Sequence, residues 1–331
     1  MSQPIPIHRI AVVGSINKDT IYLSDGREIH SYGGILYAVL PLASLVGPET
    51  RVIPVCHIGE DVADAVFALL EAYPGIDTSG IEVVPEPNYH CVIRYDASGR
   101  KEEKLLGGVP PLSYERLARF GACDALCLDF VTGLEMSLET LRRLASSTER
   151  PIFMDVHSLT LGMDTQRRRF LRRPENWQAW ARAARVVQMN EVEGRLLAGD
   201  DLDSDASVEQ FGEGVLNLGC EALVITLGAS GSVTVFRDAA GELEVLRADA
   251  APAGPVTDTT GCGDAFLAGF ALAYLRSSPK DPEARLAEAS RFANRVAGAS
   301  CVLEGIERMG EIRRLVHPQA GRGATHRLRV S

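Results

Sequence analysis

The stretch VTDTTGCGDAFLAGF, residues 256–270, decides which fold the chain is predicted to adopt. Residues 265–275 (AFLAGFALAYL) are apolar on all sides, which predicts a buried helix that begins at the glycine-rich turn. The glycines allow the backbone N–H groups of Gly261, Cys262 and Gly263 to point toward a ligand, and the helix dipole adds positive potential there. The turn is therefore a predicted anion site that uses no basic side chain.

Asp264 directly follows this turn, where its carboxylate would repel a bound anion unless it faced a third group. In phosphoryl transfer that third group is the acceptor hydroxyl. A carboxylate orients and finally deprotonates the hydroxyl, while the turn offsets charge on the phosphoryl oxygens. The alternative is an ordinary helix N-terminus, in which the glycines serve packing and Asp264 interacts with the helix dipole. We predict that Asp264 is a catalytic base, and the other motifs decide between the two interpretations.

Short apolar, β-branched runs alternate with helical segments along the chain. Strands are predicted within residues 9–16, 51–59, 124–130, 151–156, 185–190 and 222–228, and helices within residues 60–73 and 137–147. Because strands that are apolar throughout are buried on both faces, this alternation predicts an α/β fold with a doubly wound, mostly parallel sheet in three layers. No repeat or low-complexity linker divides residues 1–331, so a single domain is expected.

Two segments interrupt this alternation. Residues 18–32 and 81–105 contain short alternating strands, the second with an ASG turn at 97–99. Antiparallel ribbons inserted into a doubly wound sheet serve as flaps that exclude water when a substrate binds. We therefore predict a small β lid built from these two segments.

The composition excludes several functional classes. With a net charge of −10, the chain lacks the broad basic face that binding to nucleic acid or to an anionic membrane requires. No apolar run approaches ~18 residues, and the N-terminus does not resemble a secretory leader, which predicts a cytoplasmic protein. The seven cysteines are scattered without C-x2-C spacing, so we expect buried thiols rather than a metal site.

The segment DTTGCGDAFLAGF, residues 258–270, resembles the C-terminal signature of the ribokinase-like, phosphofructokinase-B type carbohydrate kinases. Cys262 departs from that signature, which has a small residue there, and is compatible with it if only the backbone N–H is used. Other segments resemble the family in the order that the family requires: VVGSINKD at 12–19, GGILYAVLPLASLVG at 33–47, HIGEDVADAVFALLEAYPGID at 57–77, MNEVEG at 189–194, VITLGASG at 224–231 and RFANRVAGAS at 291–300.

The resemblance implies an ATP-dependent kinase that phosphorylates a hydroxymethyl group of a sugar or sugar-like acceptor. ATP and Mg2+ are the implied cofactors, K+ is an optional one, and a homodimer is compatible with the family. The implied sites are acceptor contacts at Asn17, Asp19, Gly33 and Gly34; nucleotide contacts at Asn190, Thr226, Gly228 and Asn294; water-mediated Mg2+ binding at Glu193; and a monovalent cation site at Asp258 and Thr260.

Several of these motifs have ordinary alternatives when taken singly. Asn190 and Glu193, three residues apart after a strand, fit a helix capping box. The GASG segment at 228–231 fits a plain hairpin turn, and Asn294 fits a solvated helix position. The ordered set favours the kinase interpretation, because independent alternatives would all have to coincide.

Other functions remain to be weighed against a sugar kinase. By the resemblance, two polar sugar contacts of the family fall at Ile35 and Ala38 and are absent here. The apolar residues 35–37 favour a nucleoside kinase of the same fold. A catalytically silent ligand-binding protein is disfavoured by Asp264. A nicotinamide-dependent oxidoreductase would need G-x-G-x-x-G after the first strand, and a Walker-type NTPase would need G-x-x-x-x-G-K-[ST]; the sequence contains neither in the required place.

Residues 155–177 follow a predicted strand end, the edge at which such sheets bind ligands, and include five arginines between Arg167 and Arg173. In a functional interpretation Asp155, His157 or an arginine contacts a polar or phosphorylated substrate. The alternative is a solvated basic loop that follows a strand-end aspartate. The sequence leaves both interpretations open.

Overall fold

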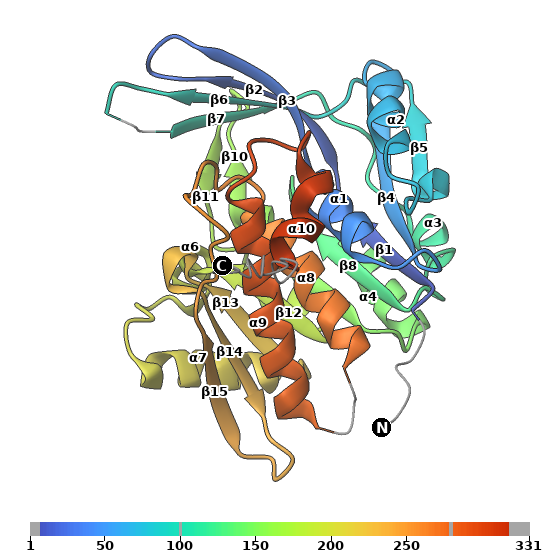
Figure 1. The fold of residues 1–331 in the computed structure, drawn as a ribbon. Helices are drawn as coiled ribbons and strands as arrows, with labels where there is room; N and C mark the ends of the chain where they lie inside the picture. Colours follow the sequence, from blue (N-terminus) through green and yellow to red (C-terminus); the bar gives the residue numbers. More distant parts are fainter. Residues whose placement is uncertain (1–6, 99–100, 278–280, 318–331) are drawn as a thin grey trace, which may run out of the picture.

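The computed structural model describes residues 7–98, 101–277 and 281–317, and its centre is a nine-stranded sheet (Figure 1). The strands in spatial order are β15 (Leu243–Ala248), β14 (Ser232–Arg237), β13 (Ala222–Thr226), β12 (Val186–Asn190), β9 (Ile152–Asp155), β8 (Ala125–Asp129), β1 (Arg9–Val13), β4 (Arg51–Gly59) and β5 (Ile81–Val84). Neighbours from β13 to β5 pair in parallel, whereas β14 and β15 pair antiparallel at one edge. The predicted mostly parallel α/β sheet is confirmed.

Helices cover both faces of this sheet and give the predicted three layers (Figure 1). Successive residues of β1 point to opposite sides, so Ile10 and Val12 join one hydrophobic core while Ala11 and Val13 join the other. The first core packs against α1 (Leu36–Leu45), α2 (Ala63–Glu71), α8 (Cys262–Arg276), α9 (Pro282–Ser300) and α10 (Ile312–Val316). The second packs against α3 (Tyr114–Ala118), α4 (Leu138–Ser147), α5 (Trp177–Ala181), α6 (Glu191–Ala198) and α7 (Asp205–Leu216).

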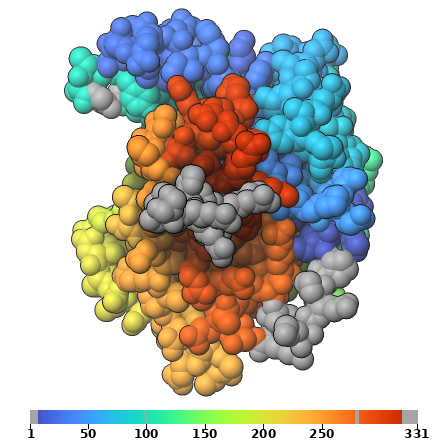
Figure 2. Space-filling view, in the orientation of Figure 1, coloured from blue at the N-terminus to red at the C-terminus, as the bar shows by residue number. Residues whose placement is uncertain are grey.

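A second sheet of four strands carries most of the predicted lid. Its order is β3 (Glu28–Gly34), β2 (Ile16–Tyr22), β6 (His90–Tyr95) and β7 (Lys101–Leu106). In the space-filling view its blue and teal strands project beyond the orange and red C-terminal helices (Figure 2). Two details of the prediction are wrong. The pair β2–β6 is parallel, and residues 81–84 form β5, which pairs with Cys56–Gly59 of β4 at the edge of the main sheet.

The arginine-rich stretch lies in and around a small hairpin, β10 (Leu161–Met163) with β11 (Arg169–Leu171). The Arg167 side chain donates to the backbone carbonyls of Leu105 at 2.7 Å and Gly107 at 2.8 Å, at the end of β7. Arg169 donates to the carbonyl of Thr132 at 2.8 Å. These arginines therefore bind the hairpin to the four-stranded sheet and to the loop after β8, and they do not form a freely solvated loop.

The carboxyl ends of the parallel strands place polar side chains along one edge of the main sheet. Asp129 ends β8 and Asp155 ends β9, and the two residues are direct partners in the parallel register. Asn190 ends β12 and pairs with Thr226 at the end of β13. Open α/β sheets bind their ligands at this edge. Among the described helices, none combines the length and apolar composition needed to cross a lipid bilayer.

Candidate active site at the start of helix α8

A cavity of about 930 Å³ opens at this edge of the sheet, in front of the first turn of α8. Asp155 at the end of β9, His157 just after this strand and Gln188 of β12 contribute to its wall. None of the described residues that line it is a lysine or an arginine. Nine of the predicted site residues do line it: Asn190, Glu193, Thr226, Gly228, Gly261, Cys262, Gly263, Asp264 and Asn294.

Gly261 makes the turn into α8 possible. Its φ of 71° lies in the left-handed region, and its carbonyl accepts the first helical bond from the N–H of Ala265 at 2.9 Å. The ring of Tyr37 occupies the space that a Cβ on Gly261 would need. A residue with a side chain would therefore meet both backbone strain and a steric clash here.

Backbone donors at this turn are available to an anion, with one exception. The N–H groups of Gly261, Gly263 and Asp264 have no acceptor among the described residues, as expected for the first turn of a helix. Cys262 donates its N–H to the carbonyl of Thr259 at 3.3 Å, a long bond. The predicted anion site therefore has free N–H donors. The N–H of Asp264 is one of them, whereas the N–H of Cys262 is not free while it is bonded to Thr259.

Asp264 lies in the first turn of α8, and only 7% of the residue is exposed. Burial raises the pKa of its carboxyl group well above the ordinary value, and repulsion from Asp129 and Asp155 adds to the rise, whereas His157 opposes it. The carboxyl group thus faces the cavity in surroundings that favour its protonated form. A neighbouring positive charge favours its ionised form.

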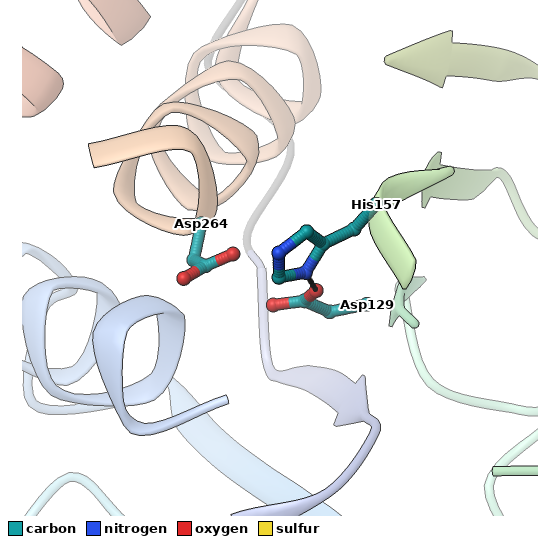
Figure 3. Close-up of side chains that lie close together, drawn as sticks. All are labelled: Asp129, His157 and Asp264. Atoms are coloured by element: carbon teal, nitrogen blue, oxygen red, sulfur yellow. Dashed lines mark ion pairs between the residues drawn. The ribbon is translucent and has the colours of Figure 1, made fainter. Parts of the chain in front are cut away.

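Asp129 and Asp264 flank the imidazole ring of His157 (Figure 3). The Nδ1 atom of His157 lies 3.7 Å from Oδ1 of Asp129, and one atom from each of the three side chains lies within 4.8 Å of the others. Asp129 is 1% exposed, and neither of its carboxylate oxygens has a hydrogen-bond partner among the described residues. The three side chains therefore form a compact ionisable group beside the α8 turn.

Gln188 connects the sheet to the same turn. Its side-chain amide donates to Oδ2 of Asp155 at 2.7 Å and to the carbonyl of Gly263 at 2.9 Å. Burial and the nearby carboxylate of Glu193 raise the pKa of Asp155 well above its usual value. The side chain of Gln188 thus holds β9, β12 and the start of α8 in one arrangement.

On the other side of the cavity, Asn190 and Glu193 form a capping box at the start of α6. Asn190 Oδ1 accepts from the N–H of Glu193 at 3.0 Å, and the carboxylate of Glu193 accepts from the N–H of Asn190 at 2.9 Å and from its side-chain amide at 2.6 Å. Each carboxylate oxygen accepts one of these bonds and keeps a lone pair. The capping alternative is therefore correct, and it leaves Glu193 able to accept from water bound to a cation.

The remaining predicted nucleotide residues differ in their freedom to bind. Gly228 has a φ of 54°, and among the described residues no atom outside its chain neighbours lies within 4 Å of the place where a Cβ would be. Asn294 is not a solvated helix residue, because it is 5% exposed and its amide donates to Ser232 Oγ at 2.9 Å and to the carbonyl of Ala248 at 3.3 Å. It therefore joins α9 to β14 and β15, although it also lines the cavity.

None of the four predicted acceptor residues lines the cavity. Asn17 and Asp19 on β2 pair with Gly33 and Ser31 of β3, and the Oδ1 atom of Asn17 is buried without a partner among the described residues. A Cβ on Gly33 would meet the carboxylate of Asp19, and Gly34 has a φ of 67°. These residues form one compact cluster at the base of the four-stranded sheet.

Tyr37 joins this acceptor cluster to the α8 turn. Its ring lies against Gly261. The carboxylates of Asp258, Asp19 and Asp264 are near enough to disfavour a negative charge on its phenol oxygen. Burial raises the pKa of the Tyr37 phenol, and these carboxylates raise it further. Ile35 and Leu36 are fully buried in the hydrophobic core and do not form the expected apolar wall. Of residues 35–37, Tyr37 is the one whose ring reaches the α8 turn.

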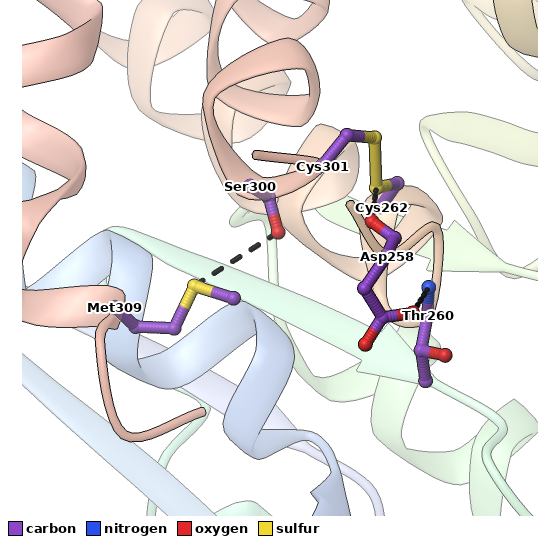
Figure 4. The surroundings of a disulfide bond; sticks show 6 residues. All are labelled: Asp258, Thr260, Cys262, Ser300, Cys301 and Met309. Carbon is purple, nitrogen blue, oxygen red and sulfur yellow. Dashed lines mark hydrogen bonds between the residues drawn. A yellow bond between two sulfur atoms is a disulfide. The ribbon is translucent and has the colours of Figure 1, made fainter. Parts of the chain in front are cut away.

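The predicted cation residues lie in the turn that precedes α8 (Figure 4). The carboxylate of Asp258 accepts from the N–H of Thr260 at 2.8 Å, and the Asp258 N–H donates to the carbonyl of Cys301 at 3.2 Å. Neither Asp258 nor Thr260 lines the cavity. The side chain of Asp258 therefore closes a tight turn with the backbone of Thr260, just before α8.

The expectation that all seven cysteines are thiols is wrong for two of them. Cys262 and Cys301 form a disulfide between the start of α8 and the end of α9 (Figure 4). The other five, Cys56, Cys91, Cys123, Cys127 and Cys220, are buried thiols as predicted. Disulfides are rare in the cytosol, so this pairing does not support the predicted cytoplasmic location.

Sequence reasoning missed Asp129 and Gln188 and left the roles of Asp155 and His157 open. Asp129 ends the run DALCLDF just as Asp155 ends PIFMDV. Carboxyl ends of adjacent parallel strands meet at one edge, so two strand-end aspartates are a detectable signal. Gln188 lies within a strand, where nothing in the residue pattern marks it. None of the five arginines from Arg167 to Arg173 is among the described residues that line the cavity.

Known proteins resemble this chain in sequence and in fold. The sequence pattern of the pfkB family carbohydrate kinases matches residues 8–308. A cytidine kinase of Thermococcus kodakarensis is 26% identical over 280 residues, which cover 84% of this chain and 92% of that protein. The structure of Arabidopsis thaliana ribokinase complexed with ribose and ATP matches with a TM-score of 0.73 at 21% identity, over 94% of this chain and 99% of that one.

A pyrophosphate-dependent kinase in the ribokinase family matches with a TM-score of 0.72 at 18% identity, over 92% of this chain and 99% of that one. Both structural matches extend over more than nine-tenths of this chain, so they include the central sheet and the helices on both of its faces. At these identities they show the fold, while the family pattern spans the α8 turn and the strand-end residues described above. This chain therefore belongs to the pfkB family of carbohydrate kinases.

Proposed function

We propose that the chain is a single kinase domain that transfers the γ-phosphoryl group of ATP to a hydroxymethyl group of a sugar or nucleoside. The observation that carries the proposal is the position of Asp264. Its buried carboxyl group and the free N–H groups of Gly263 and Asp264 face one cavity. A base for the acceptor and donors for the transferring phosphoryl group are thus side by side.

The transfer step assigns one task to each side of the cavity. Asp264 accepts the proton of the acceptor hydroxyl, and the amides of the α8 turn offset charge on the phosphoryl oxygens. Glu193, aided by Asn190, would hold Mg2+ through water, and the ion would offset charge on the phosphates of the nucleotide. Asn17 and Asp19, with the close backbone approach at Gly33 and Gly34, are the proposed acceptor contacts.

A nucleoside acceptor is the second candidate. It is favoured by the similarity to a cytidine kinase over 84% of this chain, and by the aromatic ring of Tyr37 between the acceptor cluster and the catalytic turn. Pyrophosphate is the alternative donor, because a relative of the same fold depends on it. The monovalent cation site at Asp258 and Thr260, a homodimer and a cytoplasmic location stay predictions.

The deciding experiment is a phosphoryl-transfer screen with the full chain. Pentoses, deoxyribose, hexoses and nucleosides are each tested with ATP and with pyrophosphate, with and without K+, and products are identified by mass spectrometry. We expect a phosphorylated product with ATP that disappears in the Asp264→Asn variant prepared in parallel, which excludes a contaminating kinase. Binding of ATP without product from any acceptor would favour the silent ligand-binding alternative and contradict the proposal.

A further inference from the structure

His157 has features that packing does not require. It is not a glycine, yet its φ is 34°, in the left-handed region that costs most side chains energy. Its N–H donates to Oδ1 of Asp155 at 3.2 Å, and its carbonyl accepts from the hydroxyl of Thr160 at 2.6 Å. Local bonds therefore hold the backbone in a conformation that points the imidazole between Asp129 and Asp264 (Figure 3).

The surroundings of the ring are strongly acidic. Carboxyl groups face it from four elements: Asp129 of β8, Asp155 of β9, Glu193 of α6 and Asp264 of α8. Buried carboxylates without hydrogen bonds are costly, and both oxygens of Asp129 are in that state among the described residues. Since no described lysine or arginine lines the cavity, His157 is the lining side chain able to carry a compensating positive charge.

The ionisation of the ring follows from a balance of two effects. Burial opposes a charge on the imidazole, but the carboxylates of Asp129, Asp264 and Asp155 outweigh it and raise the pKa of His157 well above its ordinary value. In turn, the His157 charge lowers the pKa of Asp264, against burial and the repulsion from Asp129. The imidazolium and the ionised form of Asp264 therefore stabilise each other.

We propose that His157 is a positioning residue for phosphoryl transfer: as an imidazolium between Asp129 and Asp264, it favours the ionised form of Asp264 and holds its carboxylate toward the acceptor hydroxyl. This inference rests on the proposed function of Asp264 as the base. In the step, the O–H bond of the acceptor breaks and its proton moves to Asp264. The new O–P bond forms as the bond from phosphorus to the leaving phosphate breaks, and His157 neither gains nor loses a proton.

The first test does not depend on activity. The imidazole of His157 is titrated by NMR in the full chain, and its signal among the seven histidines is identified by its absence from the His157→Asn variant. Asn tolerates a positive φ, so this variant removes the charge with little backbone strain. We expect His157 to titrate above its usual range, and Asp129→Asn to lower the midpoint by about one pH unit or more. If Asp129→Asn leaves the titration midpoint of His157 unchanged, the proposal is wrong.

The second test is the pH profile of kcat. In His157→Asn, the acidic limb that reports ionisation of Asp264 should move upward by about one pH unit or more, while KM for ATP changes by less than about twofold. His8→Asn, at an exposed position, is the matched control and should reproduce the wild-type profile. An equal loss of kcat at every pH, without movement of the limb, would show a merely structural role and contradict the proposal. If the wild-type chain phosphorylates no acceptor, the proposed function fails, and the NMR titration still decides whether the charged triad exists.

Discussion

The side-chain amide of Gln188 in the middle of the sheet donates a hydrogen bond to the backbone carbonyl of Gly263, 2.9 Å away in the first turn of α8. The same amide binds Asp155 at 2.7 Å. A side chain of β12 thus supports the first turn of α8, while the free N–H groups of that turn lie at the cavity. Rigid backing of this kind keeps the donors in place without reorganisation during the reaction.

Replacement of Gln188 by Leu should lower kcat by at least about tenfold, because Asp155 and the Gly263 carbonyl lose a buried donor and the turn loses its support. KM for ATP should change little, since Gln188 is not a proposed nucleotide contact. Steady-state kinetics measure both values. Gln210→Leu, on the exposed surface of α7, is the control for the same chemical change. Equal kinetics of the two variants would refute the supporting role.

Asp264→Asn should lower kcat by at least ~10²-fold and leave the affinity for both substrates nearly unchanged. The amide has the shape of the carboxylate but cannot accept the proton of the acceptor. Single-turnover and steady-state assays distinguish the chemical step from binding. The exposed Asp200→Asn variant should behave as wild type. Full turnover in Asp264→Asn would remove this residue from the role of base.

Gly261→Ala should cost roughly 3 kcal/mol or more of unfolding free energy, because the new methyl group meets both a positive φ and the ring of Tyr37. Gly241→Ala separates these causes, because Gly241 also has a positive φ, 87°, but in the described part of the chain nothing lies within 4 Å of where its Cβ would be. That control should cost about 1 kcal/mol. Urea unfolding curves of the two variants provide the comparison, and equal losses would show that the Tyr37 contact is unimportant.

Cys262→Ala should retain kcat/KM within about twofold, because the proposed anion site uses backbone N–H groups and no thiol. Its disulfide closes a separation of 39 residues, so under non-reducing conditions the variant should lose roughly 4 kcal/mol of unfolding free energy. Cys301→Ala, which breaks the same bond from α9, should lose a similar amount. A large kinetic defect confined to Cys262→Ala would reveal a role for its sulfur atom.

Asp19 should make stability depend on pH. Burial and the nearby Glu103 raise the pKa of its carboxyl group to about 7. The folded state therefore binds this proton more tightly than the unfolded state does. The contribution of Asp19 to the free energy of unfolding falls as the pH rises from the ordinary pKa of an aspartate to about 7.

Asp19→Asn keeps the neutral form at every pH, so its stability relative to wild type should increase by about 2 kcal/mol between pH 5 and pH 8. Urea unfolding at the two pH values measures the change. Asp249→Asn, at an exposed position, should show no such trend. A constant difference between Asp19→Asn and wild type would mean that Asp19 titrates at its ordinary pKa.

Much of the fold and part of the site are determined by local sequence alone. The apolar runs give strands buried on both faces, and the glycines before residues 265–275 give a helix start with open N–H groups, because backbone freedom and the first helical turn depend only on neighbouring residues. The capping box of Asn190 and Glu193 follows from a spacing of three for the same reason. Order along the chain also identified the family.

The tertiary structure decided which distant residues meet. Asp129, His157 and Asp264 come from three separate segments, and only the order of β8, β9 and α8 places them together. Pairing partners likewise decided that residues 81–84 extend the main sheet and that Cys262 reaches Cys301. Local patterns specify what a segment can form, whereas burial and the charges brought near a side chain depend on packing across the whole molecule.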